Sequence, residues 1–375
     1  MSHVHVCLVS DQPIPNLTTA LQFRPDKVIL LTTSDKKAEG KRLEGVLRKK
    51  GIDVDVRSIK PYDLNNVIEA SERVINDYPD HNLSLNITGG TKIGTVGTFQ
   101  AFYTAGKTIY YVDTFDNRIL QISPTESSIP IQASIPVADY LKTYGFNIKA
   151  WSKDDQPLYR RRKATECLVE IAIREPKSIG SLNYSVPSLD NKVSFPIRFQ
   201  APSSPQIHEL LSILAGNGYL EMTKGGTIRI DSSEIAEYLK GKWLEEYVYI
   251  VLKGLNVGEV KLNAEGTWEG QVKNPPKNEF DVLVANKNKL FLISCKTANP
   301  DRQVGEKDEA VAKEYLYELV SLGDRALGLF GKKALISARP ITNSYVRDRA
   351  NVMKVTIIDG RNIATLKENL KAWIS

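Results

Sequence analysis

The chain has 375 residues, which is long enough for two or three domains, and its 42% hydrophobic content excludes a mostly disordered protein. Its net charge is +6, from 50 Lys and Arg residues against 44 Asp and Glu residues, an excess that permits nucleic-acid binding without requiring it. Three cysteines without zinc-ligand spacing exclude a disulfide framework, and no apolar run is long enough to cross a bilayer. Since the N-terminus does not resemble a signal peptide, we predict a soluble cytoplasmic protein.

Residues 1–147 alternate between apolar runs of strand length and segments with helical spacing. This order predicts an α/β domain with a parallel, doubly wound sheet. Strands are expected at 4–9, 28–32, 54–58, 83–86 and 108–112, and helices at 16–23, 38–50, 64–77 and 91–105.

Two loops of this domain follow the first and fourth strands, at the edge where ligands of such folds bind. One runs from Ser10 to Asn16, and the other reads Asn86-Ile87-Thr88-Gly89-Gly90-Thr91-Lys92. Adjacent glycines let several backbone amides point at one place, the next helix contributes its positive end, and Lys92 adds a full charge. The second loop therefore predicts a phosphate site, although a glycine turn that caps a helix is an equally good interpretation.

Residues 148–238 are predicted to form a small, winged-helix-like α+β region, with a plain linker region as the alternative. A basic run, Arg160 to Lys163, could contact phosphates or simply begin a solvated helix. The stretch 178–205 is rich in Ser, Pro and Asn and shows no period. Helices are expected at 164–174 and 207–217, and a hairpin at 219–222 and 227–230.

Residues 239–375 are predicted to form a mixed sheet flanked by helices. A long helix at 234–252, with Gly241 as a candidate break, leads into this region. Strands are expected at 257–262, 280–284, 290–295, 333–337 and 354–359, and helices at 308–322, 345–351 and 361–373.

Four polar residues interrupt two otherwise apolar strands of this region. Glu279 and Asp281 share one face of the first strand, and Ser294 and Lys296 share one face of the second. A carboxylate beside a lysine suits metal-assisted hydrolysis, because the carboxylate can hold Mg²⁺ or Mn²⁺ and the lysine can stabilise the developing charge. An Asp–Lys ion pair on a surface hairpin is the alternative interpretation.

The N-terminal loops resemble those of the CARF domains of CRISPR-associated proteins, over about the first 145 residues. The most specific part is the segment from Asn86 to Lys92. The resemblance implies a Rossmann-like homodimer that binds a cyclic oligoadenylate, most often the tetra-adenylate, across its twofold axis. The ligand contacts that it implies are Ser10, Gln12, Asn16, Thr88, Gly89, Gly90, Thr91 and Lys92, with Thr33 as a weaker candidate.

The C-terminal residues resemble the PD-(D/E)xK nucleases, from about residue 239 to 375. In these nucleases a helix carries a Glu, a hairpin carries an Asp, and the next strand carries (D/E)-x-K. The resemblance implies Glu245 as the helix carboxylate, with Glu246 as the alternative, and it places Ser294 where an acidic residue is usual. It implies catalysis by Glu245, Asp281, Ser294 and Lys296, and metal binding by Asp281, Glu279, Glu245 and the backbone carbonyl of Cys295.

Together the two halves resemble the CARF nucleases of type III CRISPR immunity. The resemblance implies an allosteric homodimer, activated by cyclic tetra-adenylate, that nicks DNA or cuts single-stranded DNA or RNA with Mn²⁺ or Mg²⁺. A ligand-gated DNA-binding regulator with an inactive nuclease fold is the main alternative, and a ring nuclease that degrades its own ligand is another. Two further features could contact nucleic acid: a loop aromatic, Trp268, for which packing on its own domain is the favoured alternative, and the basic side chains of Arg339, Arg347 and Arg349.

Overall fold

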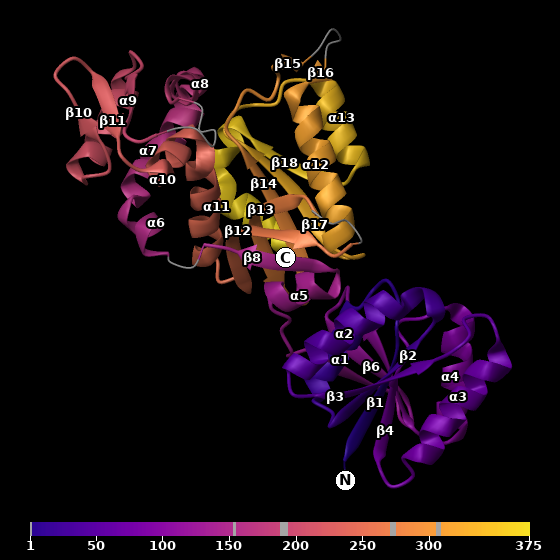
Figure 1. Ribbon diagram of the computed structural model, residues 1–375. Coiled ribbons are helices and arrows are strands. Elements are labelled where there is room, and N and C mark those ends of the chain that lie inside the picture. The colour runs from indigo at the N-terminus through magenta and orange to yellow at the C-terminus, as the bar shows by residue number, and fades with distance from the viewer. Residues whose placement is uncertain (1, 153–154, 188–193, 271–274, 305–308) are drawn as a thin grey trace.

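A computed structural model describes residues 2–152, 155–187, 194–270, 275–304 and 309–375 of the chain. It is an α/β protein with a large N-terminal sheet, a small middle sheet and a large C-terminal sheet (Figure 1). This arrangement confirms the predicted fold class. Within the described residues, no helix is long and apolar enough to span a membrane.

The N-terminal sheet is Rossmann-like, with the strand order β3-β2-β1-β4-β5-β6-β7. Its first five strands are parallel, as predicted, and the last two are antiparallel additions that the sequence analysis missed. The strands are β1 (His3–Leu8), β2 (Lys27–Thr32), β3 (Asp53–Ser58), β4 (Asn82–Asn86), β5 (Thr108–Asp113), β6 (Arg118–Ser123) and β7 (Ser127–Pro130).

Helices cover both faces of this sheet, which is why its central strands are continuously apolar (Figure 1). Helices α1 (Ile14–Phe23) and α2 (Lys37–Lys49) pack on one face, and α3 (Leu64–Asp77) and α4 (Lys92–Thr104) pack on the other. The loop before α4 ends in Thr91, whose hydroxyl accepts a hydrogen bond from Gly94 N at 3.0 Å and so caps the helix. The cap fixes the point at which the glycine loop turns into α4.

The middle region contains more regular structure than its sequence indicates. Its three-stranded sheet has the order β10-β11-β9, and the helix α8 and the strand β9 lie in the stretch for which no element was expected. The elements are α6 (Gln156–Arg160), α7 (Arg162–Arg174), α8 (Pro176–Ser185), β9 (Ile197–Gln200), α9 (Pro205–Gly216), β10 (Glu221–Met222) and β11 (Thr227–Ile230).

The C-terminal sheet has the order β18-β17-β14-β13-β12-β8. The neighbouring pairs from β8 through β12 and β13 to β14 are antiparallel. The pairs from β14 through β17 to β18 are parallel. The strands are β8 (Phe146–Ala150), β12 (Glu259–Trp268), β13 (Lys277–Asn286), β14 (Lys289–Lys296), β17 (Lys332–Ser337) and β18 (Val355–Asp359), and β15 (Gln303–Val304) pairs with β16 (Glu309–Ala310) in a separate ribbon.

Among the residues that the structure describes, six helices and two helical turns complete this part of the molecule. Helix α5 (Val137–Thr143) lies between the two large sheets (Figure 1). The long helix expected at 234–252 is interrupted by a π-helical turn at Tyr238–Lys242, which contains the break predicted at Gly241. The helices are α5, α10 (Ser233–Glu237), α11 (Trp243–Gly254), α12 (Val311–Ala326), α13 (Ser344–Val352) and α14 (Leu366–Ile374), and a 3-10 turn at Gly360–Thr365 precedes α14.

Two details differ from the sequence-based expectations. The expected boundary between residues 147 and 148 cuts through β8, which pairs with β12 and so belongs to the C-terminal sheet. The boundary between residues 238 and 239 stays a prediction. The expected loop around Trp268 is wrong, because this side chain ends β12 and is 7% exposed, with its ring 5.1 Å from that of Phe146.

Candidate ligand pocket and candidate active site

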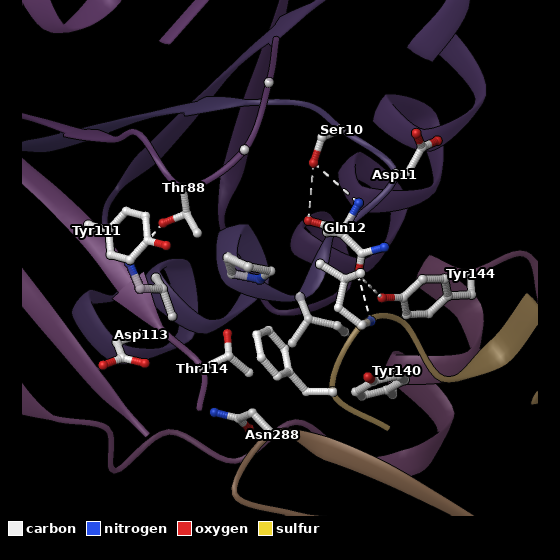
Figure 2. A pocket seen from close by; sticks show the side chains of 17 residues that line it. Ser10, Asp11, Gln12, Thr88, Tyr111, Asp113, Thr114, Tyr140, Tyr144 and Asn288 are labelled. Atoms are coloured by element: carbon white, nitrogen blue, oxygen red, sulfur yellow. Dashed lines mark hydrogen bonds between the residues drawn. The ribbon is translucent and has the colours of Figure 1, made fainter. Parts of the chain in front are cut away.

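A cavity of about 450 Å³ opens at the carboxyl ends of β1, β4 and β5. Figure 2 shows how side chains from both predicted loops face into it. Five of the residues expected to bind ligand line this cavity: Ser10, Gln12, Thr88, Gly89 and Gly90.

The two glycines are required by the close packing of their loop on β1. A Cβ on Gly89 would lie 2.7 Å from the carbonyl oxygen of Leu8, and one on Gly90 would lie 2.9 Å from the Leu8 Cβ. Gly90 also has a φ of +91°, which other residues rarely adopt. The backbone of this loop therefore forms the cavity wall directly.

Four of the expected ligand residues do not line the cavity. Asn16 is buried, and its side chain donates to Leu8 O at 2.7 Å and accepts from Asn86 at 2.9 Å. Thr33 donates to Asp35 at 2.5 Å, and Thr91 caps α4. Lys92 is exposed at the start of α4, outside the cavity lining.

The remaining lining residues were not predicted. Tyr111, Val112, Asp113 and Thr114 lie at and just after the end of β5. The topology rule that located the first two loops applies equally to this strand end, since β5 lies next to β4 in the sheet. The other residues missed are Asp11, Ile14, Pro15, Tyr140, Tyr144, Asn288, Leu329 and Phe330.

Three of these residues come from the C-terminal part of the chain. Asn288 lies in the turn between β13 and β14, and its side chain accepts from Ile135 N at 2.9 Å and donates to Ala133 O at 3.0 Å. Leu329 and Phe330 lie in the loop between α12 and β17. The cavity is thus walled by both large domains.

Gln12 connects the two domains inside this cavity. Its Oε1 accepts hydrogen bonds from the hydroxyl of Tyr144 at 3.2 Å and from the backbone N–H of Leu329 at 3.1 Å (Figure 2). Nearby, the Tyr140 hydroxyl donates to Leu327 O at 2.9 Å. A ligand that engages Gln12 would therefore disturb the loop that follows α12.

The candidate active site lies in the C-terminal sheet, on β13 and β14. Asp281 Oδ2 accepts a hydrogen bond from Cys295 N at 2.7 Å and another from Ser294 Oγ at 3.1 Å. Ser294 therefore faces Asp281 as the alternation of the strands predicts. Its hydroxyl orients the carboxylate and adds no negative charge.

The two adjacent glutamates of α11 have different environments. Glu246 is buried and accepts hydrogen bonds from Arg161 Nε, at 2.8 Å, and Arg161 Nη2. Glu245 instead accepts from Asn263 Nδ2 at 2.6 Å and is close enough to Asp281 for their charges to interact. Of the two, Glu245 is therefore the carboxylate that faces Asp281.

Burial raises the pKa values of both carboxylates, and the charge of a neighbouring carboxylate adds to each shift. The pKa of Glu245 is raised to about 8, mainly by burial and then by the charge of Asp281. Burial also raises the pKa of Asp281, although Lys296 and the hydrogen bonds from Cys295 and Ser294 oppose this shift. A recessed pair of carboxylates that resists ionisation is suited to a positively charged partner.

Glu279 and Lys242 lie at the rim of this site. Asn263 Nδ2 joins Glu279, at 3.0 Å, to Glu245. Lys242 Nζ lies 3.0 Å from Glu237 and 4.0 Å from Glu279. An open cleft of about 500 Å³ runs past Lys240, Lys242, Glu245, Lys296 and Thr297. Among the described residues, no three His, Cys, Asp or Glu side chains converge as metal ligands.

Lys296 is held between Asp281 and helix α12. Its ammonium lies 3.6 Å from Glu318 and 5.2 Å from the ring centre of Tyr315. Although burial opposes it, the charges of Asp281 and Glu318 raise the pKa of Lys296, which keeps the side chain protonated. Helix α12 therefore contacts the candidate catalytic lysine and, at its other end, leads into the loop at the ligand cavity.

Sequence comparison agrees with this two-site architecture. The chain matches a family model of the Card1 CARF domain over residues 4–140 and one of the Card1-like endonuclease domain over residues 232–375. The chain therefore contains a Card1-type CARF domain and a Card1-like endonuclease domain. No curated protein is similar enough in sequence to match it.

Solved structures share this fold over the whole chain. VC1899 from Vibrio cholerae is 20% identical, with a TM-score of 0.86 over 99% of this chain and 98% of that one. Can2 from Sulfobacillus thermosulfidooxidans, solved with cyclic tetra-adenylate, is 24% identical, with a TM-score of 0.79 over 99% and 97%. A type III CRISPR defence DNA nuclease activated by cyclic oligoadenylate is 18% identical, with a TM-score of 0.58 over 90% of this chain and 46% of that one. At these identities the comparison establishes the fold.

Proposed function

We propose that this protein is a cyclic tetra-adenylate-activated nuclease of type III CRISPR defence that hydrolyses phosphodiester bonds of DNA or RNA with a divalent metal. The CARF domain and the endonuclease domain support the two activities separately. The choice of activator is supported by Can2, which shares the fold and was solved with cyclic tetra-adenylate. The defence role is supported by the structurally similar type III nuclease.

The observation that carries this proposal is the cavity wall shared by the two domains. Gln12 of the CARF domain accepts a hydrogen bond from Leu329 of the endonuclease domain, and α12 connects that loop to Lys296. The hairpin of β13 and β14 offers a second route, since Asn288 lies at the cavity and Asp281 about 23 Å along the same strand pair. Ligand binding would change the active site if the ligand prefers one arrangement of these contacts.

In the proposed ligand site, Ser10, Gln12 and Thr88 present polar side chains, and Gly89 and Gly90 let the backbone approach phosphates. Lys92 and the N-terminus of α4 add positive charge at the side of this site. Asn16, Thr33 and Thr91 would act by shaping the loops, because their side chains are engaged within the protein.

The residues of the active site fit a hard cation such as Mn²⁺ or Mg²⁺. Asp281 and Glu245 would hold it, because each carboxylate is destabilised as an unpaired anion by burial and by a neighbouring carboxylate, which is Asp281 for Glu245 and Glu279 for Asp281. Glu279, which lies at the rim and does not converge with the other two carboxylates in this structure, and the backbone carbonyl of Cys295 are the remaining candidate ligands, and Asn263 donates to both glutamates. When bound, the metal acidifies an attacking water and polarises the phosphate. Lys296, kept protonated, would stabilise the charge that develops on the phosphate.

We further propose a homodimer with the ligand on its twofold axis. A cyclic ligand with repeated units suits a site assembled from two identical surfaces. Helix α4 begins beside the cavity and exposes three apolar side chains that a second copy would cover: Ile93, Val96 and Tyr103, which are 37%, 54% and 58% exposed.

Ser294 favours one rival, a ligand-gated regulator that binds nucleic acid without cutting it. Serine is a poor ligand for a hard cation, and it stands where these nucleases usually have a carboxylate. The rival predicts tight binding of cyclic tetra-adenylate and of DNA, with no cleavage in any divalent metal.

Cleavage of supercoiled plasmid, single-stranded DNA and single-stranded RNA by the native protein, Asp281→Ala and Lys296→Ala tests the proposed chemistry. With cyclic tetra-adenylate and Mn²⁺ or Mg²⁺ present, we expect the native protein to cut at least one substrate and both variants to lose at least 100-fold in rate. Cutting that persists in both variants would come from a contaminant or another site and would contradict the assignment.

A further inference from the structure

Helix α8 belongs to the middle region, between residues 141 and 231, which neither family model covers. Its inner face buries Ile179 and Leu182, while its outer face exposes Lys177, Ser181 and Tyr184. Tyr184 is 92% exposed. Isolated exposed aromatic residues are common on proteins, so the surroundings of Tyr184 decide whether it has a role.

Those surroundings connect α8 directly to the active-site cleft. The side chain of Asn183 donates to Thr297 Oγ1 at 3.1 Å, and Thr297 lines the cleft beside Lys296. At the end of α8, Lys240 Nζ donates to the carbonyl oxygens of Val186 and Pro187, each at 3.1 Å. Helix α8 therefore packs behind Thr297, and the chain that follows it behind Lys240, two residues that line the cleft.

On its other side, α8 borders a second open cavity of about 500 Å³, which is lined by Lys177, Tyr184 and Arg339 among others. Arg339 follows β17, and the residue before it, Ala338, donates its N–H to Lys296 O at 2.9 Å. The guanidinium lies so close to α8 that a Cβ on Gly180 would be 3.1 Å from Nη1. Arg339, which lines the second cavity, thus directly follows the residue that is hydrogen-bonded to the backbone of Lys296.

The cationic side chains of Lys177, Arg339 and Lys240 have no acidic partner among the residues that the structure describes. Ion pairs are present elsewhere in the domain, but none involves Lys177, Arg339 or Lys240. The other two arginines considered in the sequence analysis differ in this respect. Arg347 pairs with Asp359 at 2.7 Å, and Arg349 donates to the hydroxyl of Tyr317.

We propose that this surface, defined by Lys177, Tyr184 and Arg339, binds the unpaired strand of a nucleic acid and leads it past α8 into the cleft at Lys240 and Lys296. Uncompensated cations attract the phosphate backbone, and an exposed aromatic ring provides a stacking surface for a base. This combination is typical of sites that hold single-stranded nucleic acid with little sequence preference. The inference rests on the proposed function, since it assigns the substrate path of that nuclease.

The test measures binding in the absence of cleavage, so that it does not depend on nuclease activity. Fluorescein-labelled 20-nucleotide strands of DNA and of RNA are titrated with the full-length Asp281→Ala protein in EDTA and saturating cyclic tetra-adenylate, and the anisotropy gives Kd. The same background carries either Tyr184→Ala with Arg339→Ala or a control, Tyr159→Ala with Lys149→Ala. The control residues lie on α6 and β8, away from α8, and are also exposed (Figure 1).

We expect the α8-side pair to raise Kd at least tenfold and the control pair to leave it within twofold. A separate Arg339→Ala variant should lower the slope of log Kd against log salt concentration by about 0.7, as expected for one lost contact with a single strand. Whichever strand, DNA or RNA, loses affinity in the α8-side variant is the one that this surface binds. Unlabelled duplex should compete poorly with the labelled strand. Unchanged Kd in the α8-side variant, a larger loss in the control, or no binding of either strand to the parent protein would overturn the proposal.

Failure of this inference is distinguishable from failure of the proposed function. Unchanged strand binding together with activator-dependent cleavage by the native protein would reject the substrate path alone. Unaltered far-ultraviolet circular dichroism and unaltered affinity for cyclic tetra-adenylate show that the variants are folded.

Discussion

Glu245 and Glu246 are neighbours in the sequence, and the structure predicts opposite consequences for their replacement. Glu246 is 6% exposed and pairs with Arg161, which is 4% exposed. The substitution Glu246→Ala leaves a buried guanidinium whose remaining acidic partner among the described residues is the exposed Glu234, a change that costs about 3–5 kcal/mol. At about 2–4 °C per kcal/mol, the melting temperature should fall by on the order of 10 °C.

Glu245→Gln should stabilise the metal-free protein at high pH. The folded-state pKa of Glu245, about 8, lies above the unfolded value of 4.5, so the folded protein holds a proton that the unfolded chain releases between these values. The stability of the fold therefore falls as the pH rises through this window, because the unfolded chain ionises Glu245 while the folded protein keeps it protonated. The penalty is at most about 5 kcal/mol above pH 8 and vanishes below pH 4.5.

The assay for this pair of variants is thermal unfolding in EDTA at pH 5 and pH 8.5, followed by cleavage at a temperature where all proteins are folded. We expect Glu245→Gln to melt higher than the native protein at pH 8.5, to match it more closely at pH 5, and to lose cleavage. Glu246→Ala should melt lower at both pH values and cut at the native rate per folded molecule. Loss of cleavage by a folded Glu246→Ala, with native activity in Glu245→Gln, would refute this assignment.

Three further predictions concern the ligand cavity and the metal. Gly90→Ala should raise the Kd for cyclic tetra-adenylate at least tenfold in calorimetry, because a Cβ would meet Leu8 and the φ of +91° disfavours alanine; unchanged affinity would remove this loop from the site. Gln12→Leu removes the acceptor for Leu329 N and should lower the ratio of activated to basal cleavage at least tenfold; an unchanged ratio would exclude this route of coupling. Ser294→Asp should lower the Mn²⁺ concentration for half-maximal cleavage about tenfold; an increase would show that the serine is optimal.

The sequence predicted the parallel strands of the N-terminal sheet and most strands of the C-terminal sheet, because their apolar runs are bounded by polar turns, but it missed β6, β7 and β8. It also predicted which face of β13 and β14 carries Asp281 and Ser294, since strand alternation leaves little freedom. Helix α8 was missed for a physical reason. It contains Gly180, Ser181 and Asn183, which favour other conformations, and contacts such as that between Asn183 and Thr297 fix it in place.

The ligand cavity was predicted only in part. Ser10 and Gly90 follow strands whose position in a parallel sheet can be inferred from their order. The wall formed by Leu329 could not be inferred, because this residue is 317 positions away from Gln12 and no periodicity relates the two. The division of roles between Glu245 and Glu246 likewise depends on Arg161, a long-range partner that the sequence does not reveal.

The central claim, that occupation of the CARF cavity controls the endonuclease site, is tested most directly by one measurement. The initial rate of plasmid cleavage in Mn²⁺ is determined for the native protein with and without a saturating concentration of cyclic tetra-adenylate. The account predicts that the ligand raises this rate at least tenfold and that Asp281→Ala abolishes it in both conditions. A ligand that binds tightly but leaves the rate unchanged would contradict the account.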